Sequence, residues 1–212
     1  PPRDDPPMAN PEYALVTGGT GFIGQHLVRR LASDGHRVRV LVRASSDRSS
    51  FAGLDGVELR EGDILEPATL DGLAEGIEWV FHLAAAGHVS AQSAAALRRF
   101  EAINVEGLEH VMRACRGARR FVHFSSTAAM GLIKKPRVSE LDPPEPRTPY
   151  QRSKRASEER ALALGRELAL PTVVVRPCMV YGPGGRGEFE KMARWMRRGV
   201  FPRVGRGRNL TP

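Results

Sequence analysis

Six short apolar runs alternate with segments whose apolar residues recur at helical spacing, and this alternation constrains the fold more than any other feature. The runs cover Tyr13–Thr17, Arg37–Val42, Val57–Arg60, Trp79–Leu83, Arg120–Phe124 and Thr172–Val175. The helical patterns cover Phe22–Ser33, Pro67–Glu75, Ala94–Cys115 and Tyr150–Leu168. Strands that alternate with helices form a parallel sheet with helices on both faces. The sequence therefore predicts an α/β fold with a doubly wound parallel sheet.

A glycine-rich turn, Thr17 to Gly24, joins the first predicted strand to the first predicted helix. Its glycines permit a tight turn, close approach of backbone amides to a diphosphate, and close packing of helix on strand. The helix N-terminus adds partial positive charge. Such a turn can also bind nothing, but its place between strand and helix favours a Rossmann-type dinucleotide site. The residues expected to hold the dinucleotide here are Gly18, Thr20, Gly21, Phe22 and Ile23.

The end of the second predicted strand bears on the choice of cofactor. An acidic side chain there would accept hydrogen bonds from the adenosine ribose of NAD. This chain has Arg43 instead, with two serines close behind it. A guanidinium with neighbouring hydroxyls suits the 2′-phosphate of NADP, so NADP is the preferred cofactor and NAD the alternative. Arg43 could also be an exposed strand end that contacts no ligand.

Asp63 follows the third predicted strand, with Ile64 beside it. Its carboxylate could accept a hydrogen bond from the adenine amino group, and we expect both residues at the adenine end of the site. Asp is also common at turns, so Asp63 could instead cap the helix predicted from Pro67.

Tyr150 and Lys154 are four residues apart at the start of a helical pattern, which puts their side chains on one face. A lysine ammonium near a phenol favours phenolate, and we expect it to lower the tyrosine pKa from about 10. This suits proton exchange with a carbinol oxygen. The hydroxyls of Ser125 to Thr127 follow a predicted strand, where open α/β sheets place ligand-binding groups.

Six segments, in order, carry a resemblance to a known family. They are Thr17–Gly24, Phe81–Ala85, Asn104–Gly107, Ser125–Thr127, Tyr150–Lys154 and Arg176–Pro183. From Tyr13 onward the chain resembles an extended short-chain dehydrogenase/reductase of the NAD-dependent epimerase/dehydratase family. Its pattern is most similar to the dihydroflavonol reductase and 3β-hydroxysteroid dehydrogenase branches and to hopanoid-associated epimerase-like proteins.

The resemblance implies a role for each matching residue. Tyr150 would be the catalytic acid/base, and Lys154 would bind the nicotinamide ribose and tune the tyrosine. The catalytic hydroxyl is expected on Thr127, with Ser125 and Ser126 as supporting residues. The remaining implied positions are Leu83, Ala84 and Ala85 along the cofactor cleft, Asn104 near the active centre, and Pro177 beside the nicotinamide.

The segment after the sixth strand separates the branches. Nucleotide-sugar enzymes of the family usually have Asn where this chain has Met179, and a thioether cannot replace the hydrogen bonds of an amide. We therefore expect an NAD(P)-dependent oxidoreductase that transfers hydride between the cofactor and a carbonyl or hydroxyl substrate. The alternatives are a nucleotide-sugar epimerase or dehydratase, and a dinucleotide sensor without catalysis.

Composition excludes other classes. The net charge is +8, but it is concentrated in the stretch from Arg186 to Pro212, and no nucleic-acid-binding motif accompanies it. No apolar run approaches the roughly 20 residues of a membrane span. The two cysteines lack metal or disulfide spacing and the histidines are scattered, so we expect no metal and a cytoplasmic location. The family resemblance implies a small-molecule substrate and a possible homodimer, paired through the helices predicted over Ala94–Cys115 and Tyr150–Leu168.

These patterns divide the chain into three parts. Residues 1–12 form a proline-rich leader expected to be disordered. Residues 13–176 form the predicted dinucleotide-binding domain. Residues 177–212 would begin a substrate-binding lobe, which in this family normally needs about another hundred residues.

Overall fold

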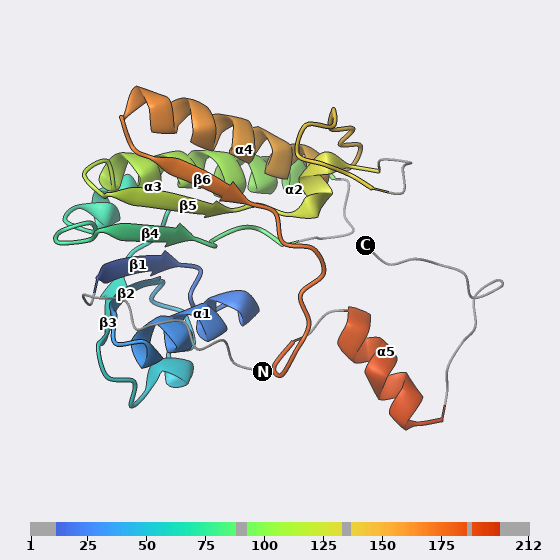
Figure 1. Ribbon diagram of the computed structural model, residues 1–212, viewed down its shortest axis with the longest axis horizontal. Coiled ribbons are helices and arrows are strands. Elements are labelled where there is room, and N and C mark those ends of the chain that lie inside the picture. The colour runs from blue at the N-terminus through green and yellow to red at the C-terminus, as the bar shows by residue number, and fades with distance from the viewer. Residues whose placement is uncertain (1–11, 88–92, 133–136, 186–187, 200–212) are drawn as a thin grey trace. The chain divides into compact units, whose positions relative to one another are not determined.

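The computed structural model describes residues 12–87, 93–132, 137–185 and 188–199. It contains one six-stranded parallel sheet with the strand order β3-β2-β1-β4-β5-β6 (Figure 1). The strands are β1 (Tyr13–Thr17), β2 (Arg37–Val42), β3 (Val57–Glu61), β4 (Trp79–His82), β5 (Arg120–Phe124) and β6 (Thr172–Val175). The predicted α/β Rossmann-type fold is confirmed, and each predicted strand lies within one residue of its place.

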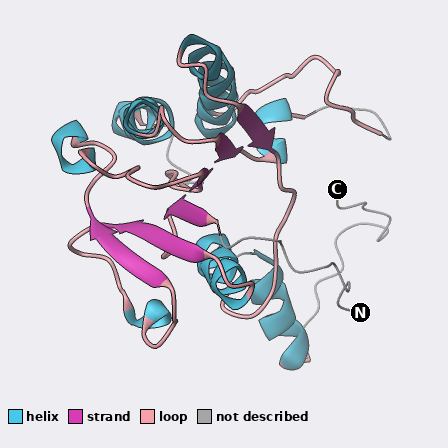
Figure 2. Cartoon of the chain, turned by 60° about the vertical axis from the view of Figure 1, so that its left-hand side comes forward, coloured by secondary structure: helices cyan, strands magenta, loops and turns pink. Residues whose placement is uncertain are grey.

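Helices cover both faces of the sheet (Figure 2). They are α1 (Phe22–Ser33), α2 (Ala94–Glu101), α3 (Gly107–Ala114) and α4 (Pro149–Glu167). A further helix, α5 (Glu188–Arg197), follows later in the chain and is not one of those on the sheet. Neighbouring residues of β1 face opposite ways, as strand geometry requires. Val16 packs in a cluster with Val28 of α1, whereas Leu15 packs in a larger cluster with Leu108 of α3 and Leu164 of α4.

Two predicted helices differ from those observed. The pattern over Pro67–Glu75 gives only a short 3₁₀ helix, η2 (Pro67–Leu70), because Gly72 adopts a positive φ of 71° that ends the helical path. The long helix predicted over Ala94–Cys115 is interrupted by a π-helical segment, η3 (Ala102–Glu106), between α2 and α3.

The chain divides into two compact units, residues 1–176 and 177–212. The sheet and the helices α1 to α4 belong to the first unit, and α5 belongs to the second. The predicted leader lies almost wholly outside the described residues, as does much of the basic stretch after residue 185.

Candidate active site

A groove of about 310 Å³ runs along the carboxyl ends of the strands. Nine of the residues expected to bind the cofactor line it: Gly18, Thr20, Gly21, Arg43, Asp63, Ile64, Leu83, Ala84 and Ala85. Phe22 and Ile23 begin α1 behind this lining. Pro177 belongs to the second unit, so its place beside a nicotinamide stays a prediction.

The turn after β1 leaves no room for side chains. Gly18 has a φ of 70°, and a Cβ there would lie 2.6 Å from the Ala84 backbone nitrogen. A Cβ on Gly24 would lie 2.3 Å from the Gly18 carbonyl oxygen. The N-cap of α1 is Gly21, which offers no side-chain hydrogen bond, so the first amides of the helix are open to a ligand. Close backbone approach and open amides fit the diphosphate of a dinucleotide.

Arg43 and Asp63 line the groove where β2 and β3 end. The Arg43 side chain is exposed, and its backbone N–H donates to Ser46 Oγ over 3.1 Å. The Asp63 carboxylate accepts from the Leu65 N–H over 2.9 Å, so it stabilises its own turn. It does not cap η2, whose N-cap is Glu66. Asp63 thus fixes the loop that forms this wall of the groove.

Tyr150 opens α4, beside Phe100 of α2, at 5.9 Å between ring centroids. A hydrogen bond joins its side chain to that of Ser126. Burial raises the pKa of Tyr150, and the bond to Ser126 only partly opposes this. The expected lowering by lysine is not seen in this structure because the Lys154 ammonium donates to a carbonyl instead of lying against the phenol.

The catalytic hydroxyl expected on Thr127 stays a prediction, and the structure offers Ser126 as a second candidate because its side chain bonds Tyr150. Thr127 begins the 3₁₀ helix η4 (Thr127–Met130), and its side chain is exposed. Ser126, the N-cap of that helix, turns its side chain inward to Tyr150 and also accepts from the Ala128 N–H over 3.1 Å. The strand ends at Phe124 as predicted, and the turn into η4 decides which of the two side chains points toward Tyr150.

Lys154 is 2% exposed and donates from Nζ to the Phe124 carbonyl oxygen over 2.9 Å. Burial lowers the pKa of Lys154 to about 8, and the charge of Glu158 opposes this change. The lysine thus lies at the carboxyl end of β5, on the same helix as Tyr150.

Asn104 links the groove to α4, the helix that carries Tyr150 and Lys154. Its Oδ1 accepts from the Ala86 N–H over 2.7 Å, and its Nδ2 donates to Ser153 Oγ over 2.9 Å. Ser153 in turn donates to the Tyr150 carbonyl over 2.9 Å. The π-helical segment presents Asn104 at this position, as π-bulges often do at functional sites. The cofactor groove and the Tyr150 helix are therefore held in one hydrogen-bonded frame.

Two histidines that the sequence left unassigned lie under this frame. His82 of β4 and His123 of β5 are register partners whose rings stack at 5.7 Å. His82 Nδ1 bonds with Thr17 Oγ1 over 2.9 Å, and His123 Nε2 bonds with Ser157 Oγ over 3.0 Å. Burial lowers the pKa of His82 to about 3 and that of His123 well below its usual value.

Sequence patterns missed several other site residues. Arg99 and Ile103 line the groove from α2 and η3, and the buried Glu158 forms an ion pair with the partly buried Arg176 one helical turn beyond Lys154. Within the described ranges, no three His, Cys, Asp or Glu side chains gather as a metal site would require. In the same ranges, no helix has the length and apolar character needed to cross a bilayer.

The sheet order, the glycine turn and the groove define a dinucleotide-binding protein of Rossmann type. The family model of the "NAD dependent epimerase/dehydratase family" matches residues 14–203, and the chain belongs to this family. The family resemblance found in the sequence is thus confirmed.

Named relatives include reductases and dehydratases. The chain is 39% identical over 184 residues to a ceramide reductase of Caulobacter vibrioides, covering 84% of this chain and 50% of the relative. It is 36% identical over 174 residues to sterol demethylase protein B of Methylococcus capsulatus, covering 80% and 52%. The chain thus spans about half the length of these curated relatives.

A solved structure gives the same fold. The dTDP-glucose 4,6-dehydratase DesIV of Streptomyces venezuelae, with NAD and TYD bound, superposes with a TM-score of 0.80 at 30% identity. The match covers 93% of this chain and 66% of that one. Structural neighbours with NAD bound support a nicotinamide cofactor for this chain.

Proposed function

We propose that this chain is the cofactor-binding part of an NADP-dependent oxidoreductase that reduces a carbonyl group to a hydroxyl. The observation that carries the proposal is that the dinucleotide groove and the helix with Tyr150 are joined by hydrogen bonds. The glycine turn and groove fit a dinucleotide, and the Asn104 bridge holds the Tyr150 helix beside them.

The chain's own residues supply the proton chemistry. When bound, NADPH supplies hydride to the carbonyl carbon. Tyr150 Oη gives its proton to the carbonyl oxygen, and the raised pKa of Tyr150 favours the protonated phenol that this direction needs. Ser126 holds the tyrosine and can donate to the same oxygen, while Lys154, on the same helix, adds a positive charge at the carboxyl end of β5.

Arg43 supports NADP over NAD. Its exposed guanidinium lines the groove with Ser46, whereas the acidic residue of that lining, Asp63, already accepts from its own loop. A 2′-phosphate would gain a charge-assisted hydrogen bond there. NAD remains the alternative cofactor, since the dehydratase that resembles this chain was solved with NAD.

One other function is favoured by a specific observation. Similarity to a dTDP-glucose dehydratase favours a nucleotide-sugar epimerase or dehydratase, in which the same residues would take hydride from the substrate and return it. Met179, at 48% exposed, stands where such enzymes usually have Asn. The dinucleotide-sensor alternative is opposed by the Tyr150, Ser126 and Lys154 arrangement.

We further propose a homodimer formed through the α2–α3 and α4 helices, which sedimentation can test. Cys115 is buried and Cys178 exposed, and both are free thiols, which favours a reducing compartment such as the cytoplasm.

The test is a panel of ketones and aldehydes offered with NADPH to the longest natural form of the protein. A reductase consumes NADPH in proportion to the alcohol formed. Product formation without loss of reduced nicotinamide would contradict the proposal and favour the epimerase.

The Tyr150→Phe variant separates an enzyme from a sensor. Loss of the proton donor should lower kcat by about 10²- to 10⁴-fold while NADPH binding persists. Unchanged turnover in this variant would exclude Tyr150 as the acid.

A further inference from the structure

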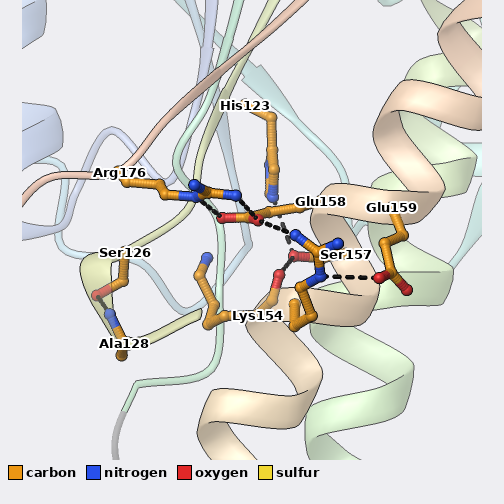
Figure 3. A network of polar contacts seen from close by, with 9 residues as sticks. His123, Ser126, Ala128, Lys154, Ser157, Glu158, Glu159 and Arg176 are labelled. Carbon is orange, nitrogen blue, oxygen red and sulfur yellow. Dashed lines mark hydrogen bonds and ion pairs between the residues drawn. The ribbon is translucent and has the colours of Figure 1, made fainter. Parts of the chain in front are cut away.

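Glu158 lies one helical turn beyond Lys154 on α4, and its side chain is 1% exposed. Its carboxylate is bound by both arms of one guanidinium, from Arg176 Nε over 2.8 Å and Nη2 over 2.7 Å (Figure 3). Arg155 approaches the same carboxylate at 3.5 Å. The carboxylate is therefore fixed in place, deep beside the candidate active site.

Arg176 comes from a different part of the fold. It directly follows β6 and ends the first compact unit. The preceding Val175 carbonyl accepts from the Ser125 N–H over 2.8 Å, next to the serine that bonds Tyr150. The Glu158–Arg176 pair thus fastens α4 to the end of β6, which is hydrogen-bonded to the first of the serines that follow β5.

Stability alone is a poor reason for this pair. Burying a carboxylate costs several kcal/mol of hydration, and well-packed apolar residues are often as stabilising as a buried ion pair. The negative charge of Glu158 is therefore better explained by an electrostatic effect on a neighbouring group than by stability.

Lys154 is the neighbouring group on which the Glu158 charge acts. Its ammonium is buried, and burial favours loss of the proton. The Phe124 carbonyl that accepts its hydrogen bond brings no full negative charge to offset this. The titratable and charged groups around Lys154 are Tyr150 on α4, His82 on β4, His123 on β5, Arg155, Glu158, and Arg176 after β6. In this set, Glu158 brings the negative charge.

We propose that Glu158, clamped by Arg176, is a positioning residue that keeps the Lys154 ammonium charged and ties α4 to the end of β6. This inference rests on the proposed function, because it assigns Glu158 a task at the same site. Glu158 acts through Lys154 and does not contact the reacting atoms.

The test measures the ionisation of Lys154 directly. The sequence has four lysines, at 134, 135, 154 and 191, so ¹³C-lysine NMR of the 212-residue chain gives few signals, and Lys154→Met assigns the one of interest. Glu158→Gln should lower the pKa of Lys154 by about one unit, since an adjacent anion is lost. It should also move the alkaline limit of kcat to lower pH.

Two variants make this result specific. Glu159→Gln changes the next residue, whose side chain is 61% exposed and bonds Arg155 over 2.7 Å, and should leave the pKa of Lys154 unchanged. Arg176→Gln removes the opposing cation and should raise that pKa. If the pair were purely structural, Glu158→Gln and Arg176→Gln would shift the pKa of Lys154 in the same direction.

An unmoved Lys154 pKa in folded Glu158→Gln would overturn the inference, as would an equal shift in Glu159→Gln. If Glu158→Gln does not fold, a fall of the pKa in Arg176→Gln overturns it. The NMR measurement needs neither substrate nor cofactor. A chain that shows the shift but reduces no carbonyl therefore counts against the proposed function alone.

Discussion

The Tyr150 phenol depends on its two neighbours in opposite ways. Burial against Phe100 keeps it protonated, while the bond to Ser126 orients its oxygen and favours ionisation. Lys154 does not control the ionisation of the Tyr150 phenol in this structure, because its ammonium donates to the Phe124 carbonyl. In the free chain, the residues therefore favour a proton donor over a phenolate base.

The adjacent hydroxyls of Ser126 and Thr127 offer a matched comparison. Ser126→Ala should lower kcat by about 10²-fold, because it removes a hydrogen bond at the reacting oxygen. Thr127→Val should keep most activity, since this side chain is exposed at the start of η4. Steady-state rates of both variants measure the difference. A larger loss in Thr127→Val would identify Thr127 as the catalytic hydroxyl.

Sequence patterns predicted the place of those single residues that directly follow a strand. Gly18, Arg43 and Asp63 were placed at the groove because their positions follow directly from strand ends. The choice between Ser126 and Thr127 depends on the turn after β5, where Ser126 caps η4 and Thr127 begins it, and a strand pattern does not predict that turn.

Among the elements, the turn between β1 and α1 does most to shape the cofactor groove. Gly18→Ala places a Cβ 2.6 Å from the Ala84 nitrogen, on backbone that cannot move away easily. It should destabilise the chain by about 2–4 kcal/mol and abolish NADPH binding.

Gly35→Ala is the matched control, since Gly35 also has a positive φ, of 85°, but open space around its Cβ position. It should cost only about 1 kcal/mol and leave binding intact. Urea unfolding and a binding titration compare the two variants. Equal costs would mean that backbone strain, and not close approach, explains the glycine at position 18.

Element identities were predicted well, but their internal irregularities were not. Periodicity predicted one helix over Ala94–Cys115, whereas the π-helical segment arises where Asn104 bonds Ala86 and Ser153. Both partners are distant in sequence, so a local pattern carries no sign of them. The Glu158–Arg176 pair joins α4 to the end of β6 in the same long-range way.

For the whole molecule, the buried histidines make stability depend on pH. The unfolded chain binds a proton at His82 below about pH 6.5, whereas the folded chain does so only near pH 3. Stability is therefore complete above pH 6.5 and falls as the pH drops toward 3, by about 2 kcal/mol from His82 at pH 5.

Urea unfolding at pH 7.5 and pH 5 measures this loss. His82→Gln should lose less stability between the two pH values than the wild type, because the titrating group is gone. An identical loss in both proteins would show that other groups, such as the paired carboxylates, carry the acid sensitivity.

Every role proposed for this chain depends on binding of NADP in the groove beside Tyr150, through the glycine turn and Arg43. A fluorescence titration of the purified chain with NADPH and with NADH measures that binding. We predict saturable binding with NADPH at least about tenfold tighter, a preference that Arg43→Ala removes. Absence of binding to either cofactor would contradict the dinucleotide site, and tenfold tighter binding of NADH would overturn the assignment of Arg43.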